Sequence, residues 1–180
     1  MGVMQMNDTP ALVREASERA LRMLGEGAKQ REILPVLVRA AEKATGGNAV
    51  SSILVIDGDG LLRNGASPGL PEDYLKAIDR LKPDPGVGTC AAAAATGRVV
   101  HTPDFRADGK WAELRHLPMA LGFLGAWSQP IKSPEGKVLG TFGTYFRESR
   151  SPTEQEQRDV AALASTAAIV IDACSARCHD

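Results

Sequence analysis

The sequence predicts an α+β fold built on one central antiparallel β-sheet. Three observations favour it: two helical patterns precede the first strand, the strand patterns form two hairpins, and one long helical pattern closes the chain. We expect the N- and C-terminal helices on one face of the sheet, and an excursion of helices and loops that forms a pocket on the other face. We interpret residues 1–30 as an N-terminal helical extension and residues 31–180 as the domain with its long C-terminal helix.

The first two elements are predicted to be helices. Apolar residues recur at spacings of three and four after Asp8-Thr9-Pro10, a typical helix start, and Gly25 interrupts this pattern. A second helix is expected from Arg31 to Thr45, because its apolar residues share one face and Gly46-Gly47 follows as a stop signal. That apolar face should lie against the sheet.

The strands are predicted as two antiparallel hairpins. Residues 49–56 are apolar and β-branched, and an Asp/Gly-rich turn separates them from residues 61–66, which resume as a strand. Residues 123–131 and 138–146 are the two strongest strand patterns, and a turn rich in serine, proline and glycine joins them. The second hairpin should therefore be the longer one.

Short elements are predicted between the hairpins. A short helix opens at Pro71, a strand is expected over residues 98–101, and residues 110–121 are a helix candidate. After the second hairpin, the segment 151–156 has the composition of a helix cap with an acidic first turn. It is expected to open the long closing helix, whose apolar residues continue to Cys174.

A glycine loop leads into a run of alanines in this middle segment. Pro85-Gly86-Val87-Gly88-Thr89-Cys90 precedes five consecutive alanines, Ala91 to Ala95, and Thr89 is a candidate cap for the helix that follows. The start of such a helix directs unpaired N–H groups at one spot, which suits an anion or a carbonyl-bearing ligand. A turn whose alanines simply pack beneath the sheet is the alternative interpretation.

Composition narrows the class of protein. The chain has 180 residues and is 43% hydrophobic, with 21 basic and 22 acidic residues, so no electrostatic footprint for nucleic acid is visible. We see no apolar stretch of membrane-spanning length and no signal peptide. The three cysteines do not form a disulfide framework. We therefore expect a cytoplasmic protein that binds neither nucleic acid nor membrane.

Several motifs carry a resemblance to a known family. They are Gly86-x-Gly88-Thr89-Cys90-Ala91-x-Ala93, Thr102-x-Asp104-Phe105, Leu121-Gly122-Phe123-x-x-Ala126-Trp127-Ser128-x-Pro130-Ile131, Gly136-x-Val138-Leu139-Gly140-Thr141-Phe142, and Arg150-x-Pro152-x-x-x-Glu156. Over Arg31 to Ala173 the chain resembles the GAF domain family. The likeness is to the GAF domains of bacterial sensor histidine kinases and cyclic-dinucleotide enzymes, and to stand-alone nitrate-sensing GAF proteins.

The resemblance implies a pocket between the sheet and the excursion. Its ligand-binding residues would be Gly88, Thr89, Cys90, Ala91, Ala92, Trp111, Phe123, Trp127 and Ser128. The alternative interpretation is that Trp111 and Trp127 are residues of the hydrophobic core and bind no ligand. The implied function is small-molecule sensing in bacterial signal transduction, with an anion such as nitrate as one ligand and a histidine kinase or response regulator as partner. A homodimer through the terminal helices is expected, with the alanine-rich face of Val160 to Ile171 as its contact.

Two other functions remain open, and several cofactors are not expected. A free methionine-R-sulfoxide reductase needs an attacking and a resolving cysteine, and Cys90 at a helix start would have a lowered pKa. A scaffold without ligand is the third reading. We expect no bilin and no haem, because His116 has no adjacent cysteine and no histidine is marked as an axial ligand. Cys174, Cys178 and His179 form a tail that zinc could use in a dimer.

Overall fold

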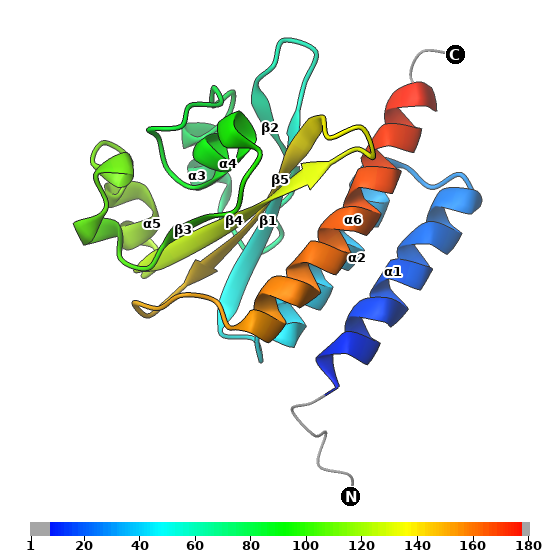
Figure 1. Cartoon of the computed structure of the whole chain (residues 1–180), viewed down its shortest axis with the longest axis horizontal. Helices are drawn as coiled ribbons and strands as arrows, with labels where there is room; N and C mark the ends of the chain where they lie inside the picture. The colour runs from blue at the N-terminus through cyan, green and yellow to red at the C-terminus, as the bar shows by residue number, and fades with distance from the viewer. Residues whose placement is uncertain (1–7, 178–180) are drawn as a thin grey trace, which may run out of the picture.

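A five-stranded antiparallel sheet organises the chain in the computed structural model, which describes residues 8–177 (Figure 1). The strands lie in the order β2-β1-β5-β4-β3. They are β1 (Ala49–Ile56), β2 (Leu62–Ala66), β3 (Val100–Thr102), β4 (Gly125–Lys132) and β5 (Val138–Phe146). All neighbouring strands pair antiparallel, so the predicted fold class is confirmed.

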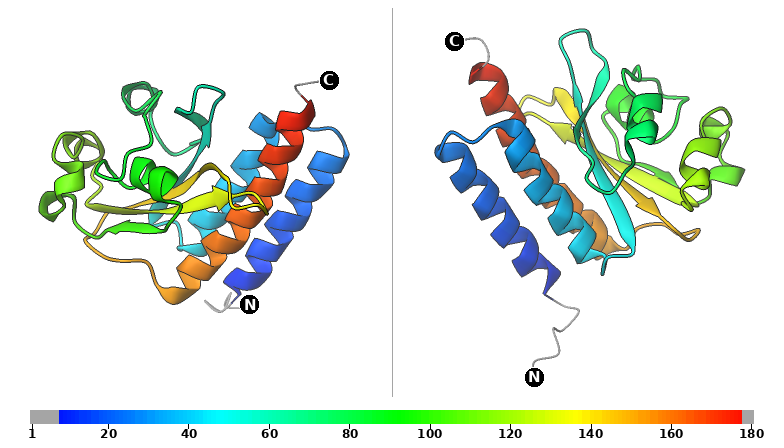
Figure 2. Two further views of the ribbon diagram at one scale, coloured as in Figure 1. Left: turned by 45° about the horizontal axis from the view of Figure 1, so that its top comes forward. Right: turned by 180° about the vertical axis from the view of Figure 1, so that it is seen from behind.

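Three helices cover one face of this sheet (Figure 2). They are α1 (Thr9–Gly25), α2 (Gln30–Ala44) and α6 (Glu154–Arg177). The sheet contacts α2 and α6, whereas α1 packs on these two helices as an outer layer. The hydroxyl of Thr166 on α6 lies 2.9 Å from the hydroxyl of Ser17 on α1, which ties the outer layer to the inner one. The predicted helical layer on one face is therefore confirmed.

The alanine-rich face of α6 is used inside the chain. Its buried residues pack against α1, α2 and the sheet, and they are Val160, Leu163, Ala164, Ala167, Ala168, Val170 and Ile171. By length and composition α6 could cross a membrane, because an 18-residue window within it has a mean hydropathy of 1.5. In this structure 56% of that window is buried, so its apolar residues serve the packing of the domain. The predicted use of this face as a dimer contact is wrong, because the chain itself covers it.

The start of α6 is fixed by a capping box. The backbone N–H of Glu156 donates to Oγ1 of Thr153 over 3.1 Å, and the N–H of Thr153 donates back to Oε1 of Glu156 over 2.8 Å. Arg150 adds two hydrogen bonds of 2.7 and 2.8 Å to the same carboxylate. The guanidinium carbon of Arg150 lies 3.8 Å from the centre of the Phe146 ring. The predicted cap is confirmed, and it is anchored to the end of β5.

Short helices occupy the other face (Figure 2). They are α3 (Glu72–Ala77), α4 (Cys90–Thr96), the 3-10 helices η1 (Phe105–Ala107) and η2 (Gly109–Trp111), and α5 (His116–Ala120). The predicted single helix over residues 110–121 is wrong. Pro118 has no N–H and clashes within a helix, but it is tolerated in the first turn of α5, where N–H groups need no intrahelical partner. The chain therefore breaks into η2 and α5.

Side chains of the central strands alternate between the two faces. On β4, Trp127 and Ile131 join the cluster under the helices, whereas Ala126 joins the cluster under the excursion. On β5, Phe142 packs on the helices and Tyr145 on the excursion. The sheet thus separates a helix-side core from an excursion-side core, and the candidate site lies in the second.

Candidate functional site

The glycine loop delivers Gly88 against the indole of Trp111. Gly88 has a φ of 56°, in the left-handed region that favours glycine, and its N–H donates to the carbonyl of Lys110 over 2.8 Å. A Cβ placed on Gly88 would lie 3.6 Å from Cζ2 of Trp111. The loop and the end of η2 are therefore bound together at this point, directly before α4.

A small cavity lies beside this contact. Its volume is about 20 Å³, enough for roughly one water molecule. Five of the predicted site residues line it: Gly88, Thr89, Cys90, Ala91 and Trp111. The other lining residues are Leu54, Tyr74, Ile78, Leu81, Leu114, Leu117 and Tyr145. Among residues 8–177, no lysine or arginine lines this cavity, so its chemistry is apolar with a few hydroxyl, thiol and indole groups.

Trp111 lines the cavity and carries a buried hydrogen-bond donor. The residue is 5% exposed, and its ring lies 4.5 Å from the ring of Phe105, centre to centre. Its Nε1 is buried and makes no hydrogen bond with any residue of the described chain. A buried donor without a partner costs about 1–3 kcal/mol, so an acceptor in the cavity would recover that free energy.

Two tyrosines form the opposite wall. Their hydroxyl oxygens, Oη of Tyr74 on α3 and Oη of Tyr145 on β5, lie 2.7 Å apart, and their rings meet edge to face at 5.9 Å. Burial raises the pKa of both phenols, so both remain protonated at neutral pH. One of the two hydroxyl protons is used in the mutual bond. The other is free to be donated to a third group.

Cys90 is held as a neutral thiol in the cavity wall. Its Sγ lies 3.1 Å from Oγ of Ser128, and a Cβ at Gly143 would stand 3.1 Å from the same sulfur. Burial raises the pKa of the thiol, and the surrounding hydroxyls of Ser128, Thr141 and Thr89 offset this only in part. The predicted lowering of this pKa by a helix start is wrong, because desolvation of the buried thiolate outweighs the helix end.

The cysteines are not arranged for a disulfide relay within residues 8–177. Cys174 is buried in the helix-side core, whereas Cys90 lies on the excursion side of the sheet. Sulfoxide reduction by this route needs an accessible thiolate with a second thiol beside it. The predicted tail of Cys174, Cys178 and His179 lies partly outside the described residues, which end at Arg177.

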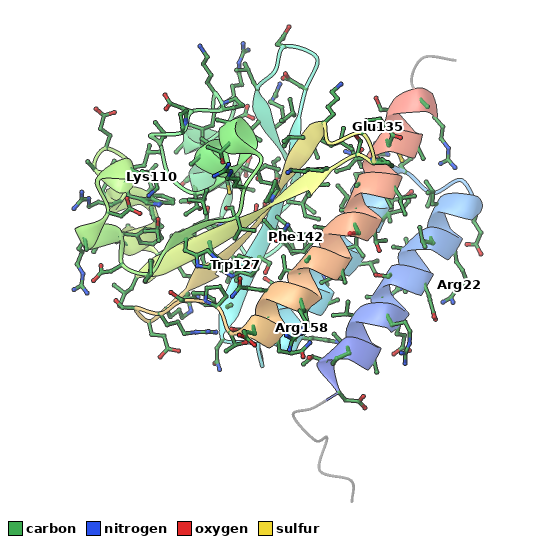
Figure 3. The ribbon with its side chains drawn as sticks, in the orientation of Figure 1. Arg22, Lys110, Trp127, Glu135, Phe142 and Arg158 are labelled. Atoms are coloured by element: carbon green, nitrogen blue, oxygen red, sulfur yellow. The ribbon has the colours of Figure 1, made fainter. Side chains whose placement is uncertain are left out.

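Trp127 does not line the cavity. It is 1% exposed and belongs to the helix-side core, with its ring 5.9 Å from the ring of His101. Figure 3 shows Trp127 and Phe142 near α6, well away from Lys110 in the excursion. The prediction that Trp127 faces the glycine loop is wrong, because neighbouring residues of a strand point to opposite faces and Ser128 takes the excursion side.

The remaining predicted residues, Ala92, Phe123 and Ser128, do not line the cavity. Phe123 stacks on Tyr145 with ring centres 5.3 Å apart, and Ala92 is buried in α4.

Thr89 occupies the N-cap position of α4, but its side chain makes no capping hydrogen bond. Because Thr89 is buried against the cavity, its predicted capping role is wrong.

Tyr74 and Tyr145 are the site residues that sequence reasoning missed. In β5 the neighbours of Tyr145 point to the opposite face of the sheet. In α3, Tyr74 lies on the same side of the helix as Ile78. Reading the alternation of β5 outward from Phe142 would have placed Tyr145 on the excursion side. Its contact with Tyr74 joins residues far apart in sequence and has no local signal.

These features define an α+β domain with an internal cavity between its sheet and its excursion. A family model described as the GAF domain matches residues 27–172. The chain therefore belongs to the GAF domain family.

One curated relative is a sensor. The chain is 33% identical over 157 residues to the methyl sulfide methyltransferase-associated sensor of Methanosarcina acetivorans, an alignment that covers 87% of this chain and 16% of that protein. The chain thus spans about a sixth of the length of this relative.

Solved structures show the same fold. The GAF domain of a phosphoenolpyruvate-protein phosphotransferase from Coxiella burnetii aligns with a TM-score of 0.77 at 19% identity, covering 98% of this chain and 99% of that one. The free methionine-R-sulfoxide reductase of Neisseria meningitidis, in complex with its substrate, aligns with a TM-score of 0.73 at 14% identity, covering 98% and 96%. At these identities the likeness shows the fold alone.

Proposed function

We propose that this chain is a small-molecule sensor module of signal transduction, and that its ligand occupies the cavity between α4, η2 and β5. The observation that carries this proposal is that Trp111 lines the cavity and that its buried Nε1 has no hydrogen-bond partner within residues 8–177. An acceptor on a bound ligand that reached this Nε1 would satisfy it. The sensor relative and the family support the same reading.

The cavity favours a small ligand with hydrogen-bond acceptors. Trp111 and the Tyr74–Tyr145 pair each have a proton to donate, while most of the remaining wall is aliphatic. A strongly hydrated anion would lose its water without gaining a cation in return, so phosphate is disfavoured. A small, weakly hydrated anion such as nitrate, or a neutral molecule of a few atoms, fits these donors. Entry requires the cavity to widen beyond its present volume.

The signal would pass to the helical layer. A ligand that contacts Tyr145 acts on β5, whose end holds the start of α6 through Arg150. A ligand shifts this equilibrium only if it binds the two arrangements with different affinity. We propose a histidine kinase or a response regulator as the partner that reads the helices, a cytoplasmic location and a homodimeric state.

The two indoles provide the test. In a ¹⁵N–¹H spectrum of the full chain, nitrate and a panel of small acceptor molecules are titrated while the indole signals of Trp111 and Trp127 are followed. We expect a ligand to shift the Trp111 signal and to leave that of Trp127 in place. Trp111→Phe should abolish binding, whereas Trp127→Phe, the matched control on the other face, should retain it.

The opposite pattern would refute the proposal. If binding survives Trp111→Phe, or if only the Trp127 signal responds, the ligand does not occupy this cavity. If no member of the panel shifts either indole, and native protein carries no small molecule that mass spectrometry detects after denaturation, the sensor reading fails and the scaffold reading stands.

A further inference from the structure

The edge of the sheet at β4 is uncovered beyond the short strand β3. The pairing of β3 with β4 ends at Val100, which lies opposite Ser128. Residues 129–132 of β4 therefore have β5 as their one neighbouring strand in the described chain. In place of a further strand, the end of α4 and the first half of α6 lie beside this edge (Figure 1).

A groove occupies this position. It is bounded by Gly97, by β4 from residue 129 to 132 and by α6 from residue 161 to 165, and we call it the edge groove. Its volume is about 220 Å³, against about 20 Å³ for the cavity described above. At about 30 Å³ for each molecule of liquid water, it has room for about seven waters, or for a molecule with about as many non-hydrogen atoms.

One cation borders the edge groove, and no acidic residue of the described chain lines it. This cation is Lys132, whose Nζ lies 3.4 Å from the position that a Cβ on Gly97 would take. The carbonyl end of α4 favours a cation at this point, which keeps the ammonium beside the groove. None of the ion pairs within residues 8–177 involves Lys132. Its three protons are therefore available to an anion.

Gln129 adds a second donor on the same strand. Its side chain lines the edge groove, and its Nε2 makes one long hydrogen bond of 3.5 Å to the carbonyl of Pro130. An amide nitrogen has two protons, so one remains for an acceptor in the groove. The hydroxyl of Ser165 already donates to the carbonyl of Ala161 over 3.1 Å and can only accept a further bond. The donors thus gather on β4.

The rest of the edge groove is apolar. Val99, Pro130, Ala161 and Ala164 line it, and Val99 is 40% exposed, one of three large hydrophobic residues within 8–177 that are exposed. A bound aliphatic chain would remove this apolar surface from water. An inorganic anion would leave it hydrated. The wall therefore favours an anion that carries a short hydrocarbon chain.

A polypeptide strand is a poorer occupant of this edge. Pro130 has no N–H to donate to a new strand. The pairing of β4 with β5 shifts register between Ile131 and Lys132, and such a bulge bends an edge away from straight pairing. Proteins use these two devices to prevent the addition of strands at an open edge. A small molecule does not need the backbone ladder.

We infer that the edge groove is a second ligand site, for a short aliphatic carboxylate. The carboxylate pairs with Lys132 and accepts a hydrogen bond from Gln129, while the hydrocarbon chain lies on the apolar wall. This site is separate from the cavity of the proposed function and does not depend on it. The two are connected by α4, because Cys90 at its start lines the cavity and Gly97 at its end lines the edge groove.

Titration of the full chain with sodium valerate and sodium butyrate is the test, followed in ¹⁵N–¹H spectra. We expect the amide signals of Gly97 and Val99 to shift, and the indole signal of Trp111, which reports on the cavity, to stay in place. Valerate should bind about fourfold more tightly than butyrate, because it buries one more methylene. Valeramide, its neutral counterpart, should bind about tenfold more weakly than valerate.

Two pairs of variants locate the site. Ala161→Leu fills the edge groove from a half-buried position and should abolish valerate binding, whereas Ala162→Leu, on the next and exposed residue, should retain it. Leucine is a good helix former, so both variants should keep α6. Lys132→Met should weaken valerate binding about tenfold and leave valeramide binding unchanged. Lys137→Met, an exposed lysine of the same hairpin outside the groove, is its control.

Four outcomes would overturn the inference. They are equal affinity for valerate and valeramide, equal losses with Ala161→Leu and Ala162→Leu, equal losses with the two lysine variants, and no shift at Gly97 or Val99 at any valerate concentration. If valerate shifts the Trp111 indole instead, the carboxylate enters the cavity, which supports the proposed function and refutes this site. A response at Gly97 in a protein whose Trp111 indole answers no ligand would leave this site standing while the sensor cavity fails.

Discussion

Trp111 and Trp127 lie on opposite faces of the same sheet, and each has a buried Nε1 without a hydrogen-bond partner among residues 8–177. Of the two, only Trp111 lines the cavity described above. Trp127 is packed in the helix-side core. The binding role that we propose therefore belongs to Trp111, and Trp127 has a packing role on the other face.

Replacing Gly88 should uncouple ligand binding from folding. Gly88→Val places a β-branched residue at a φ of 56°, so we expect a loss of about 1–2 kcal/mol of unfolding free energy and the loss of ligand binding at the Trp111 wall. Gly60→Val is the matched control, since Gly60 has a φ of 80° but no atom within 4 Å of its Cβ position. Thermal shift with saturating ligand is the measurement.

The wild type and Gly60→Val should both gain about 5–10 °C at a hundredfold excess of ligand over Kd. Gly88→Val should gain nothing. An undiminished gain in Gly88→Val would show that the ligand does not approach this loop.

The contact between Gly143 and Cys90 should be tight. Gly143→Ala adds a carbon about 3.1 Å from Sγ of Cys90 and 3.5 Å from Oγ of Ser128, so we expect a loss of about 1–3 kcal/mol from overpacking. Cys90→Ala should relieve this loss in the double variant. A urea-denaturation cycle of the four proteins measures the coupling, and strictly additive losses would contradict the contact.

Stability should fall at alkaline pH. The Cys90 thiol and the phenols of Tyr74 and Tyr145 all have raised pKa values in the folded protein because burial disfavours their charged forms. Their stabilising contribution is complete below the ordinary pKa values of 9.0 for the thiol and 10.0 for the phenols. It is lost as pH rises above them, since the unfolded chain then releases protons that the folded chain retains.

Urea titrations between pH 7 and pH 11 test this. In Tyr74→Phe the decline above pH 10 should be shallower than in the wild type. A decline of the same slope in both proteins would show that the tyrosine pair does not carry it.

The clamp at the start of α6 should depend on Glu156. Burial raises the pKa of this carboxyl, but hydrogen bonds from Arg150 and the Thr153 N–H outweigh it and leave the pKa below its ordinary value of 4.5. Its stabilisation is therefore present above pH 4.5 and is lost as pH falls further. Glu156→Gln should cost about 1–3 kcal/mol at pH 7.

Glu154→Gln is the control and should cost little unfolding free energy, because Glu154 is exposed and lies two residues before Glu156 in α6. If both variants lose the same amount, the effect is one of net charge and the clamp contributes nothing specific.

Most of the fold was accessible from the sequence because its signals are local. The cap at Thr153 and Glu156, the glycine stops after the helices and the Asp/Gly-rich turn of the first hairpin are each decided by nearby residues. The helix predicted over residues 110–121 was wrong because one proline decided where the chain could bend. The division at residue 30 stays a prediction.

Only part of the candidate site could be predicted from the sequence. The loop from Gly88 to Ala91 and Trp111 were predicted, and the structure brings them together at the cavity. Trp127 was misplaced because β4 is buried on both faces, so its sequence shows no polar and apolar alternation from which a face could be read. The pair of Tyr74 and Tyr145 joins two distant segments, and only the folded sheet and excursion define it.

Tyr145 and Phe146 are consecutive residues, yet the first forms a wall of the cavity and the second carries the Arg150 clamp of α6. One peptide unit therefore separates the cavity wall from the ring on which Arg150 packs, although a loop connects the end of β5 to the start of α6. The β5 backbone at Tyr145 and Phe146 is paired on both sides, with β1 and with β4. In the proposed sensor, a displacement of Tyr145 would therefore reach the Arg150 contact through one rigid peptide unit and need not pass through the whole domain.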